Sequence, residues 1–148
     1  MALSALALFA IGCSSKPPID TSRTLSVNEV LQNIDSLNGM RVKVFGFMPG
    51  CGVYDCSLFA NEHQANDFWR IADSPERKEK LPQFVEIGSD PGFDAKTGPL
   101  TGHYVVVTGR VTNECRPHSR ESCTDRGPDL VPIDIALSTQ QPTQAVPS

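Results

Sequence analysis

The sequence contains no apolar run long enough to cross a membrane as a helix. Its longest run, Ala2–Gly12, has eleven residues, whereas a spanning helix needs about twenty. Positive charge is also scarce: 13 Lys and Arg face 17 Asp and Glu, which gives a formal net charge of −4. Because neutralisation of phosphates supplies most of the affinity for nucleic acid, a chain without a basic stripe predicts no nucleic-acid partner.

Residue patterns typical of catalysis are missing as well. The three histidines, His63, His103 and His118, are scattered, and no serine lies in a Gly-x-Ser-x-Gly sequence. The aspartates fall mostly in turn-like stretches, where Asp is common because its carboxylate bonds to its own backbone. We therefore expect no catalytic residues, no cofactor and no enzymatic activity.

The first apolar run ends in Ala10-Ile11-Gly12-Cys13. Its length matches the core of a secretion signal, and these four residues resemble the lipobox of bacterial lipoproteins. The resemblance implies that residues 1–12 are a removed signal peptide and that Cys13 carries acyl chains such as palmitate. Because Ser14 rather than Asp follows the cysteine, it also implies an outer-membrane anchor facing the periplasm. The alternative is a buried N-terminal helix in which Cys13 is a structural thiol.

The rest of the chain divides into a tether, one domain and a tail. Residues 13–24 contain Pro17-Pro18 and predict a flexible link from the membrane. Residues 25–138 have the size of a single domain. Residues 139–148 have no charged side chain and little to bury, so we expect them to be disordered.

Four further cysteines are an even number, which favours disulfides in an exported chain. We expect the local pairs Cys51–Cys56 and Cys115–Cys123, while crossed pairs remain the alternative. Spacings of four and seven residues within the pairs are longer than those of structural zinc sites, so we expect no metal. A thiol redox protein is a further alternative, although such proteins use Cys-x-x-Cys at a helix N-terminus.

The apolar pattern predicts a mainly β domain with two helices. Ser26 and Glu29 form a capping-box pattern that begins a helix over residues 27–37, and a shorter helix is expected over residues 62–72. Gly46 and Gly109 interrupt strands and indicate bulges or bends. In the last strand, Val131, Ile133 and Ile135 are expected to share one face. The five predicted strands are residues 41–48, 56–60, 83–89, 103–113 and 129–138.

Two phrases, "SLNGMRVKVFGFM" and "GPLTGHYVVVTGRVT", resemble small OB-like barrel domains of exported bacterial proteins. The resemblance implies that residues 25–138 form a five-stranded OB-like barrel. The helix expected at residues 62–72 departs from that family, because it falls between the second and third strands, whereas an OB-fold has its helix between the third and fourth. An open sandwich or another small barrel remains an alternative.

An arginine-rich stretch, "GRVTNECRPHSRESCTDRG", separates the last two predicted strands. A loop in this place borders the ligand face of OB barrels, and a disulfide would lower the ordering cost of binding. We nevertheless expect a solvated surface loop that is stapled for stability alone, with recognition as the alternative. Trp69, the single tryptophan, is expected to pack in the core, and the alternative is an exposed platform that stacks on a sugar or a partner. The candidate binding residues are Arg110, Arg116, His118, Arg120 and Arg126.

These features together favour a lipid-anchored binding module of the cell envelope without catalytic activity. We expect it to present its disulfide-stapled loops to an envelope protein, or else to a glycan. The alternatives are an envelope enzyme whose cysteines or carboxylates are assembled by the fold, such as a thiol redox protein, and a lipoprotein that only spaces an assembly.

Overall fold

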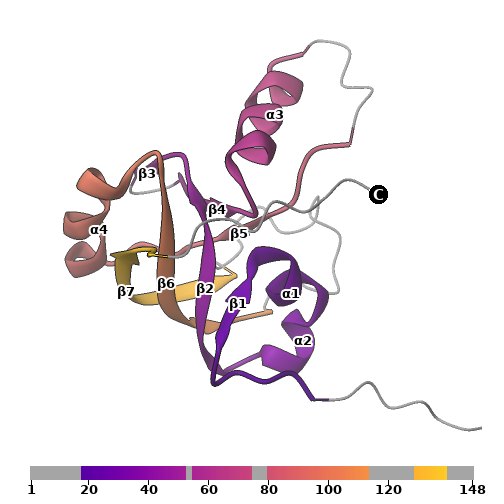
Figure 1. Ribbon diagram of the computed structural model, residues 1–148, viewed down its shortest axis with the longest axis vertical. Coiled ribbons are helices and arrows are strands. Elements are labelled where there is room, and N and C mark those ends of the chain that lie inside the picture. Colours follow the sequence, from indigo (N-terminus) through magenta and orange to yellow (C-terminus); the bar gives the residue numbers. More distant parts are fainter. Residues whose placement is uncertain (1–17, 53–54, 75–79, 114–128, 140–148) are drawn as a thin grey trace, which may run out of the picture.

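The computed structural model describes residues 18–52, 55–74, 80–113 and 129–139. Seven strands form a mainly antiparallel sheet with the order β3-β4-β2-β6-β7, while β1 pairs with β2 and β5 pairs with β4. Figure 1 shows this sheet with short helices around it. The strands are β1 (Thr24–Ser26), β2 (Arg41–Met48), β3 (Cys51–Gly52), β4 (Asp55–Phe59), β5 (Phe84–Glu86), β6 (His103–Val111) and β7 (Leu130–Leu137).

The protein is therefore mainly β, as predicted, but the strand count of five is wrong. The two additional strands, β1 and β3, have three and two residues, too few to produce an alternating pattern. The closed barrel is not confirmed, because the path of paired strands runs open from β3 to β7. Among the described residues, one isolated parallel bridge, Ile87 to Leu130, joins the segment after β5 to β7.

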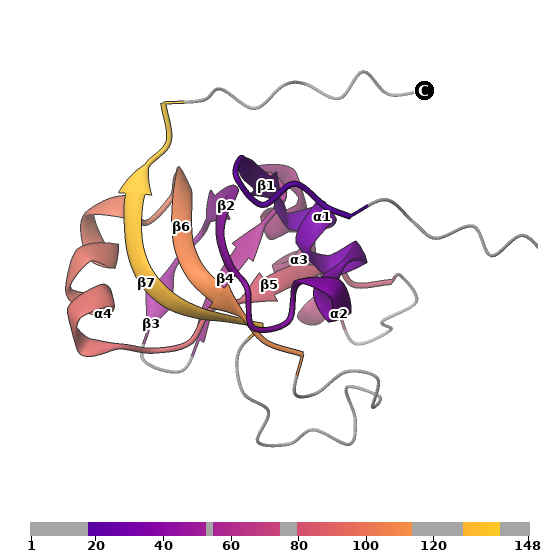
Figure 2. The same ribbon diagram turned by 90° about the horizontal axis from the view of Figure 1, so that it is seen from below.

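Short helices flank the strands on two opposite sides (Figure 2). The predicted helix 27–37 is two helices, α1 (Val27–Gln32) and α2 (Ile34–Leu37), and the predicted helix 62–72 is α3 (Glu62–Ala72). The sequence prediction missed α4 (Pro91–Thr97) and a 3-10 turn at Gly98–Leu100. No helix in the part of the chain that the structure describes is long and apolar enough to span a membrane.

The core lies between the inner face of the sheet and α1, α2 and α4. Apolar side chains that alternate along β2 and β6 point into it, and the capping box of α1 is present as predicted, with the Ser26 hydroxyl accepting from the Glu29 N–H. A smaller aromatic cluster, Phe47 and Phe59 with Ala65 of α3, borders this core. The residues that are completely buried include Leu25, Val27, Val30, Leu37, Val44, Leu58, Val85, Val105, Val107 and Leu130.

Both strand glycines lie close to a neighbouring strand, because a Cβ at either position would come within 3.0 Å of it, but they differ in register. Gly109 lies at a register shift between β6 and β7, so the predicted bulge is confirmed there. Gly46 causes no shift in the β2–β6 pairing; instead, a Cβ at this position would lie 2.6 Å from the backbone oxygen of Phe59. Gly46 therefore allows β2 and β4 to approach closely.

The bulge also changes the faces of β7. Gly109 pairs with Pro132 and Thr108 with Asp134, so Ile133 is the additional residue. As a result, Ile135 is buried while Ile133 is 48% exposed. The expectation that Val131, Ile133 and Ile135 share one face is therefore wrong, because the extra residue reverses the alternation.

Candidate functional site

The two predicted binding loops begin at opposite ends of the sheet. Met48 of β2 lies opposite His103 of β6, and Arg41 lies opposite Arg110. We call the part with Met48–Phe59 and the start of β6 the hairpin end. We call the part with Met40, Arg41, Arg110 and residues 111–113 the loop end, because the arginine-rich stretch leaves β6 there. In Figure 1 the hairpin end and α3 are at the top, and the N-terminal segment enters at the bottom.

A disulfide staples the hairpin end. Cys51 of β3 and Cys56 of β4 face each other in the strand register, and their sulfur atoms are bonded, with the Cα atoms 4.1 Å apart. The predicted local pair is therefore confirmed, and the crossed pairings of these two cysteines are excluded. Cys115, Cys123 and the acylation candidate Cys13 lie outside the described residues.

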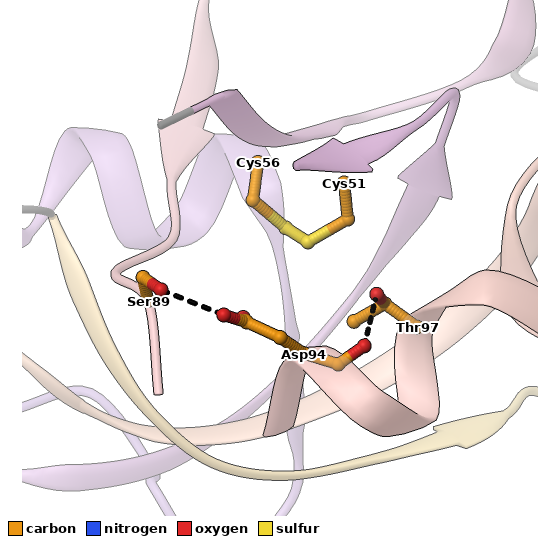
Figure 3. The surroundings of a disulfide bond; sticks show 5 residues. All are labelled: Cys51, Cys56, Ser89, Asp94 and Thr97. Atoms are coloured by element: carbon orange, nitrogen blue, oxygen red, sulfur yellow. Dashed lines mark hydrogen bonds between the residues drawn. A yellow bond between two sulfur atoms is a disulfide. The ribbon is translucent and has the colours of Figure 1, made fainter. Parts of the chain in front are cut away.

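The stapled hairpin lies beside α4 (Figure 3). Asp90 caps this helix by accepting from the N–H groups of Gly92 and Phe93. The Ser89 hydroxyl donates to the Asp94 carboxylate at 2.7 Å, and the Thr97 hydroxyl donates to the Asp94 carbonyl at 2.8 Å. These bonds within the helix and at its start give the hairpin a rigid neighbour.

An exposed tryptophan lies on α3, which packs on the hairpin end. Phe68 lies against Phe84 and Phe59, with ring centroids 5.2 and 5.5 Å away. Trp69 meets Phe68 edge to face at 5.2 Å, yet 47% of Trp69 is exposed. The expectation that Trp69 packs in the core is therefore wrong: Phe68 fills that place, and Trp69 lies on the surface with one side held by Phe68.

Three cations gather on the outer face of the sheet at and next to the loop end. Arg41 and Arg110 are direct cross-strand partners, and Lys43 lies two residues further along β2. All three side chains are exposed. Like charges directly opposite each other destabilise a sheet pair. No carboxylate among the described residues forms an ion pair with them, in contrast to Arg23 with Glu29 and Lys96 with Asp134.

Two shallow hollows adjoin this cationic group. The first, of about 270 Å³, is lined by hydroxyls of the N-terminal segment, Thr21 and Ser22, together with Arg41, Lys43 and Thr108. The second, of about 400 Å³, shares Lys43 and Thr108 with it and extends along β7. Cations and hydroxyl donors on a solvent-facing surface are suited to bind anions.

The two ends of the arginine-rich stretch are pinned together at the loop end. Thr112 donates its N–H to the Asp129 carbonyl at 2.9 Å, and the buried Asp129 carboxylate accepts from the Glu86 N–H at 3.1 Å. Asn113 donates to the Asp35 carboxylate at 3.0 Å. Of the five predicted loop residues, Arg110 is described. Arg116, His118, Arg120 and Arg126 lie outside the described residues.

The described histidines have local partners. His63 lies 3.2 Å from the Asp67 carboxylate on the next turn of α3, and the His103 ring nitrogen Nδ1 lies 2.8 Å from the Thr101 carbonyl. Within the described ranges, no group of three or more His, Cys, Asp or Glu residues is placed to hold a metal ion.

No family model matches the chain, and comparisons with curated proteins and with solved structures found no match either. The described residues therefore carry the functional argument. Sequence reasoning missed the partners that the fold brings to Arg110, since Arg41 and Lys43 are separated from it by more than 60 residues of chain. The alternation of Arg41 and Lys43 with buried valines placed them on the outer face, but nothing local indicated their neighbour.

Proposed function

We propose that this protein is a lipid-anchored binding module of the cell envelope, without catalytic activity, held to the outer membrane through acylated Cys13. Its domain presents the hairpin end, away from the tether, to another envelope protein. A glycan is the less favoured ligand. The lipobox-like Ala10-Ile11-Gly12-Cys13 supports the anchor, and the arrangement of the two ends supports the direction in which the domain faces.

The proposed architecture is an OB-like barrel that is partly open. Five strands support it by their pairings: β2 pairs with β4 and β6, β4 with β5, and β6 with β7. An isolated parallel bridge joins Ile87, directly after the third of these strands, to Leu130 of the fifth. Helix α4 lies between the third and fourth strands, where OB-folds have their helix, and α3 is an insertion. OB-folds are five-stranded, partly open barrels that bind ligands through strands and loops.

Trp69 is the observation that carries the proposed partner site. It is half exposed on α3, and its ring is oriented by Phe68, which Phe59 and Phe84 hold in turn. Tryptophan is enriched among residues that dominate binding energy. A ring already held in place loses less conformational freedom on binding. This combination favours protein recognition.

The stapled hairpin supports binding over thiol exchange. Cys51 and Cys56 bond between two strands, whereas the redox alternative uses a helix N-terminus to lower the pKa of an attacking thiol. The stretch from Arg110 to Arg126 remains a second candidate contact. Its pinned ends lie at the loop end, so it would meet a different part of the partner than Trp69 does.

The test is cross-linking in intact cells, followed by identification of the captured proteins by mass spectrometry. Trp69→Ala should reduce capture of the partner by about 30-fold, the scale of a hot-spot loss, and Trp69→Phe should restore part of it. His63→Ala on another face of α3 is the matched control and should capture normally. Cys13→Ala should release the protein from the membrane fraction.

Other outcomes separate the alternatives. Equal capture by Trp69→Ala and wild type would remove the hairpin end as the partner site. If Arg116→Ala with Arg126→Ala lowers capture instead, the arginine-rich stretch is the contact. An unmodified Cys13 with residues 1–12 still attached would refute the anchor.

A further inference from the structure

The cationic group at the loop end has no function in the proposed partner site. Arg41, Lys43 and Arg110 are exposed, and two of them face each other across β2 and β6. By contrast, three other surface cations, Arg23, Arg70 and Lys96, are ion-paired with Glu29, Asp67 and Asp134. The exposed group therefore has the charge to attract an anionic surface, and an anion between the two arginines would relieve their repulsion.

The N-terminal segment joins this group to the predicted anchor. Thr21 and Ser22 line the same hollow as Arg41 and Lys43. Thr21 is eight residues after Cys13, and eight residues span at most about 29 Å of chain. An acylated Cys13 would thus hold the hollow close to the lipid headgroups, which raises their effective concentration at the cations.

We propose that the outer face formed by Arg41, Lys43 and Arg110, with the Thr21 and Ser22 hydroxyls beside it, docks on the anionic phospholipid headgroups of the membrane that carries the anchor. The proposal rests on the anchor at Cys13 and names the surface that the tethered domain turns toward the bilayer. The acyl chains on Cys13 supply the attachment, and a basic patch adds electrostatic attraction to anionic lipids. Here the patch orients the domain, so that the hairpin end and Trp69 face away from the lipid.

Two carboxylates lie near this face: Asp134, which lines the second hollow, is ion-paired with Lys96, whereas Asp20 opposes the attraction. Asp20 accepts bonds from the N–H and the hydroxyl of Ser22 at 2.9 and 2.6 Å. These bonds keep the pKa of Asp20 below its ordinary value, so it is ionised beside the hollow at neutral pH. Its removal should strengthen docking, which provides a variant of opposite sign.

The test measures binding of the full chain carrying Cys13→Ala to lipid vesicles by flotation. Neutral phosphatidylcholine vesicles report the contribution of the apolar run Ala2–Gly12, which is the same in every variant. Vesicles with added phosphatidylglycerol report the anionic contribution. Each cation near such a surface contributes about fivefold in partitioning. The triple variant Arg41→Gln, Lys43→Gln, Arg110→Gln should therefore lose about 100-fold of the anionic contribution.

Two controls define the surface. Arg70→Gln on α3 removes one positive charge near the hairpin end, one third of the charge removed in the triple variant, and should bind as wild type does. Asp20→Asn should bind anionic vesicles more strongly. At 1 M salt the screening length falls to about 3 Å, so the difference between the two vesicle types should disappear. Thermal unfolding of each variant verifies that the fold is intact.

The proposal is wrong if the triple variant partitions like wild type, or if Arg70→Gln loses about the fivefold that is expected of one patch residue. A second outcome would also refute it: the triple variant loses its cross-links to the partner in cells, but its binding to vesicles is unchanged. The face formed by Arg41, Lys43 and Arg110 would then be a protein-binding site. Because this assay uses an unacylated chain and no partner, its failure leaves the Trp69 and Cys13 experiments valid. Their failure likewise leaves the vesicle result standing.

Discussion

The hairpin end and the loop end of one sheet are stabilised in different ways. At the hairpin end, a disulfide joins Cys51 to Cys56. There Trp69 packs against Phe68, which in turn packs against Phe84. At the loop end, the contacts are polar: Thr112 bonds Asp129, and Asn113 bonds Asp35. Covalent and aromatic contacts fix a surface that presents apolar side chains, whereas hydrogen bonds fix a surface that exposes charge.

This difference bears on function. A partner that buries Trp69 gains most from a surface that is already rigid. A membrane is laterally fluid and offers many headgroups, so charge density matters more than the fixed position of any one side chain. The construction of each end therefore matches the ligand proposed for it.

Gly46 lies between the two ends, and changing it should have the largest effect. On the loop-end side of Gly46, β2 pairs with β1, and on the hairpin-end side it pairs with β4. A Cβ there would lie 2.6 Å from both Leu58 and the Phe59 backbone oxygen, and 3.0 Å from Val27. We expect Gly46→Ala to lower the free energy of unfolding by about 3 kcal/mol, because overpacking forces both strands apart. Urea unfolding measures it.

Gly50→Ala is the matched control, since nothing lies within 4 Å of a Cβ at that position. It should change the free energy of unfolding by less than about 0.5 kcal/mol. If the two variants are equally stable, the close approach of β2 and β4 at Gly46 is not a constraint on the fold.

Removal of the disulfide should affect the hairpin end alone. Cys51→Ala with Cys56→Ala is expected to cost about 2 kcal/mol, because the short loop between the cysteines gains freedom in the unfolded chain. Chemical denaturation of oxidised and double-variant protein measures the cost. Partitioning into anionic vesicles should stay the same, and a parallel loss there would mean that the two ends are not independent.

Glu29 offers a smaller change close to the loop end. Hydrogen bonding from Arg23 and from the Ser26 N–H and hydroxyl lowers the pKa of Glu29 from 4.5 to about 2. Because the pKa is lower in the folded state, the stabilisation is complete above about pH 4.5 and is lost as the pH falls toward 2. Glu29→Gln should therefore cost about 1 kcal/mol at pH 7, a value reduced by solvent screening of this partly exposed pair.

The pH dependence is the check on that assignment. The stability difference between wild type and Glu29→Gln, measured by urea unfolding, should be constant above pH 5 and shrink to nothing near pH 2. A difference that persists at pH 2 would assign the effect to the shape of the side chain rather than to its charge.

The smallest expected effect is at the ion pair between Lys96 and Asp134. Both side chains are 56% exposed, so Lys96→Ala should leave the melting temperature unchanged within error. The Lys96 ammonium donates to Asp134 at 2.6 Å and lowers the pKa of that carboxyl. In the variant, an NMR titration should find the pKa of Asp134 closer to its ordinary value; an unmoved pKa would contradict the pairing.

Some features of the fold could have been read from the sequence but were not. Asp90 followed by Pro91 is a helix-start signal, with an N-cap acceptor and proline in the first turn, yet the many glycines and prolines around it favoured a loop. Helix α4 therefore had a local signal. The partial exposure of Trp69 had none, because Phe68 and Trp69 are neighbours and either one could have been the buried ring.

Local sequence alone determined the elements whose bonds are local. The capping box at Ser26 and Glu29, the turns of α3 and the Cys51–Cys56 pair all join residues a few positions apart, so pattern and spacing predicted them. The long strands were predicted from their apolar alternation, although their hydrogen bonds join residues distant in the chain. Only the tertiary structure decided which side chains meet across strands. The bulge opposite Gly109 reversed the faces of β7, and pairing of β2 with β6 placed Arg41 against Arg110, because strand register depends on partners distant in the chain.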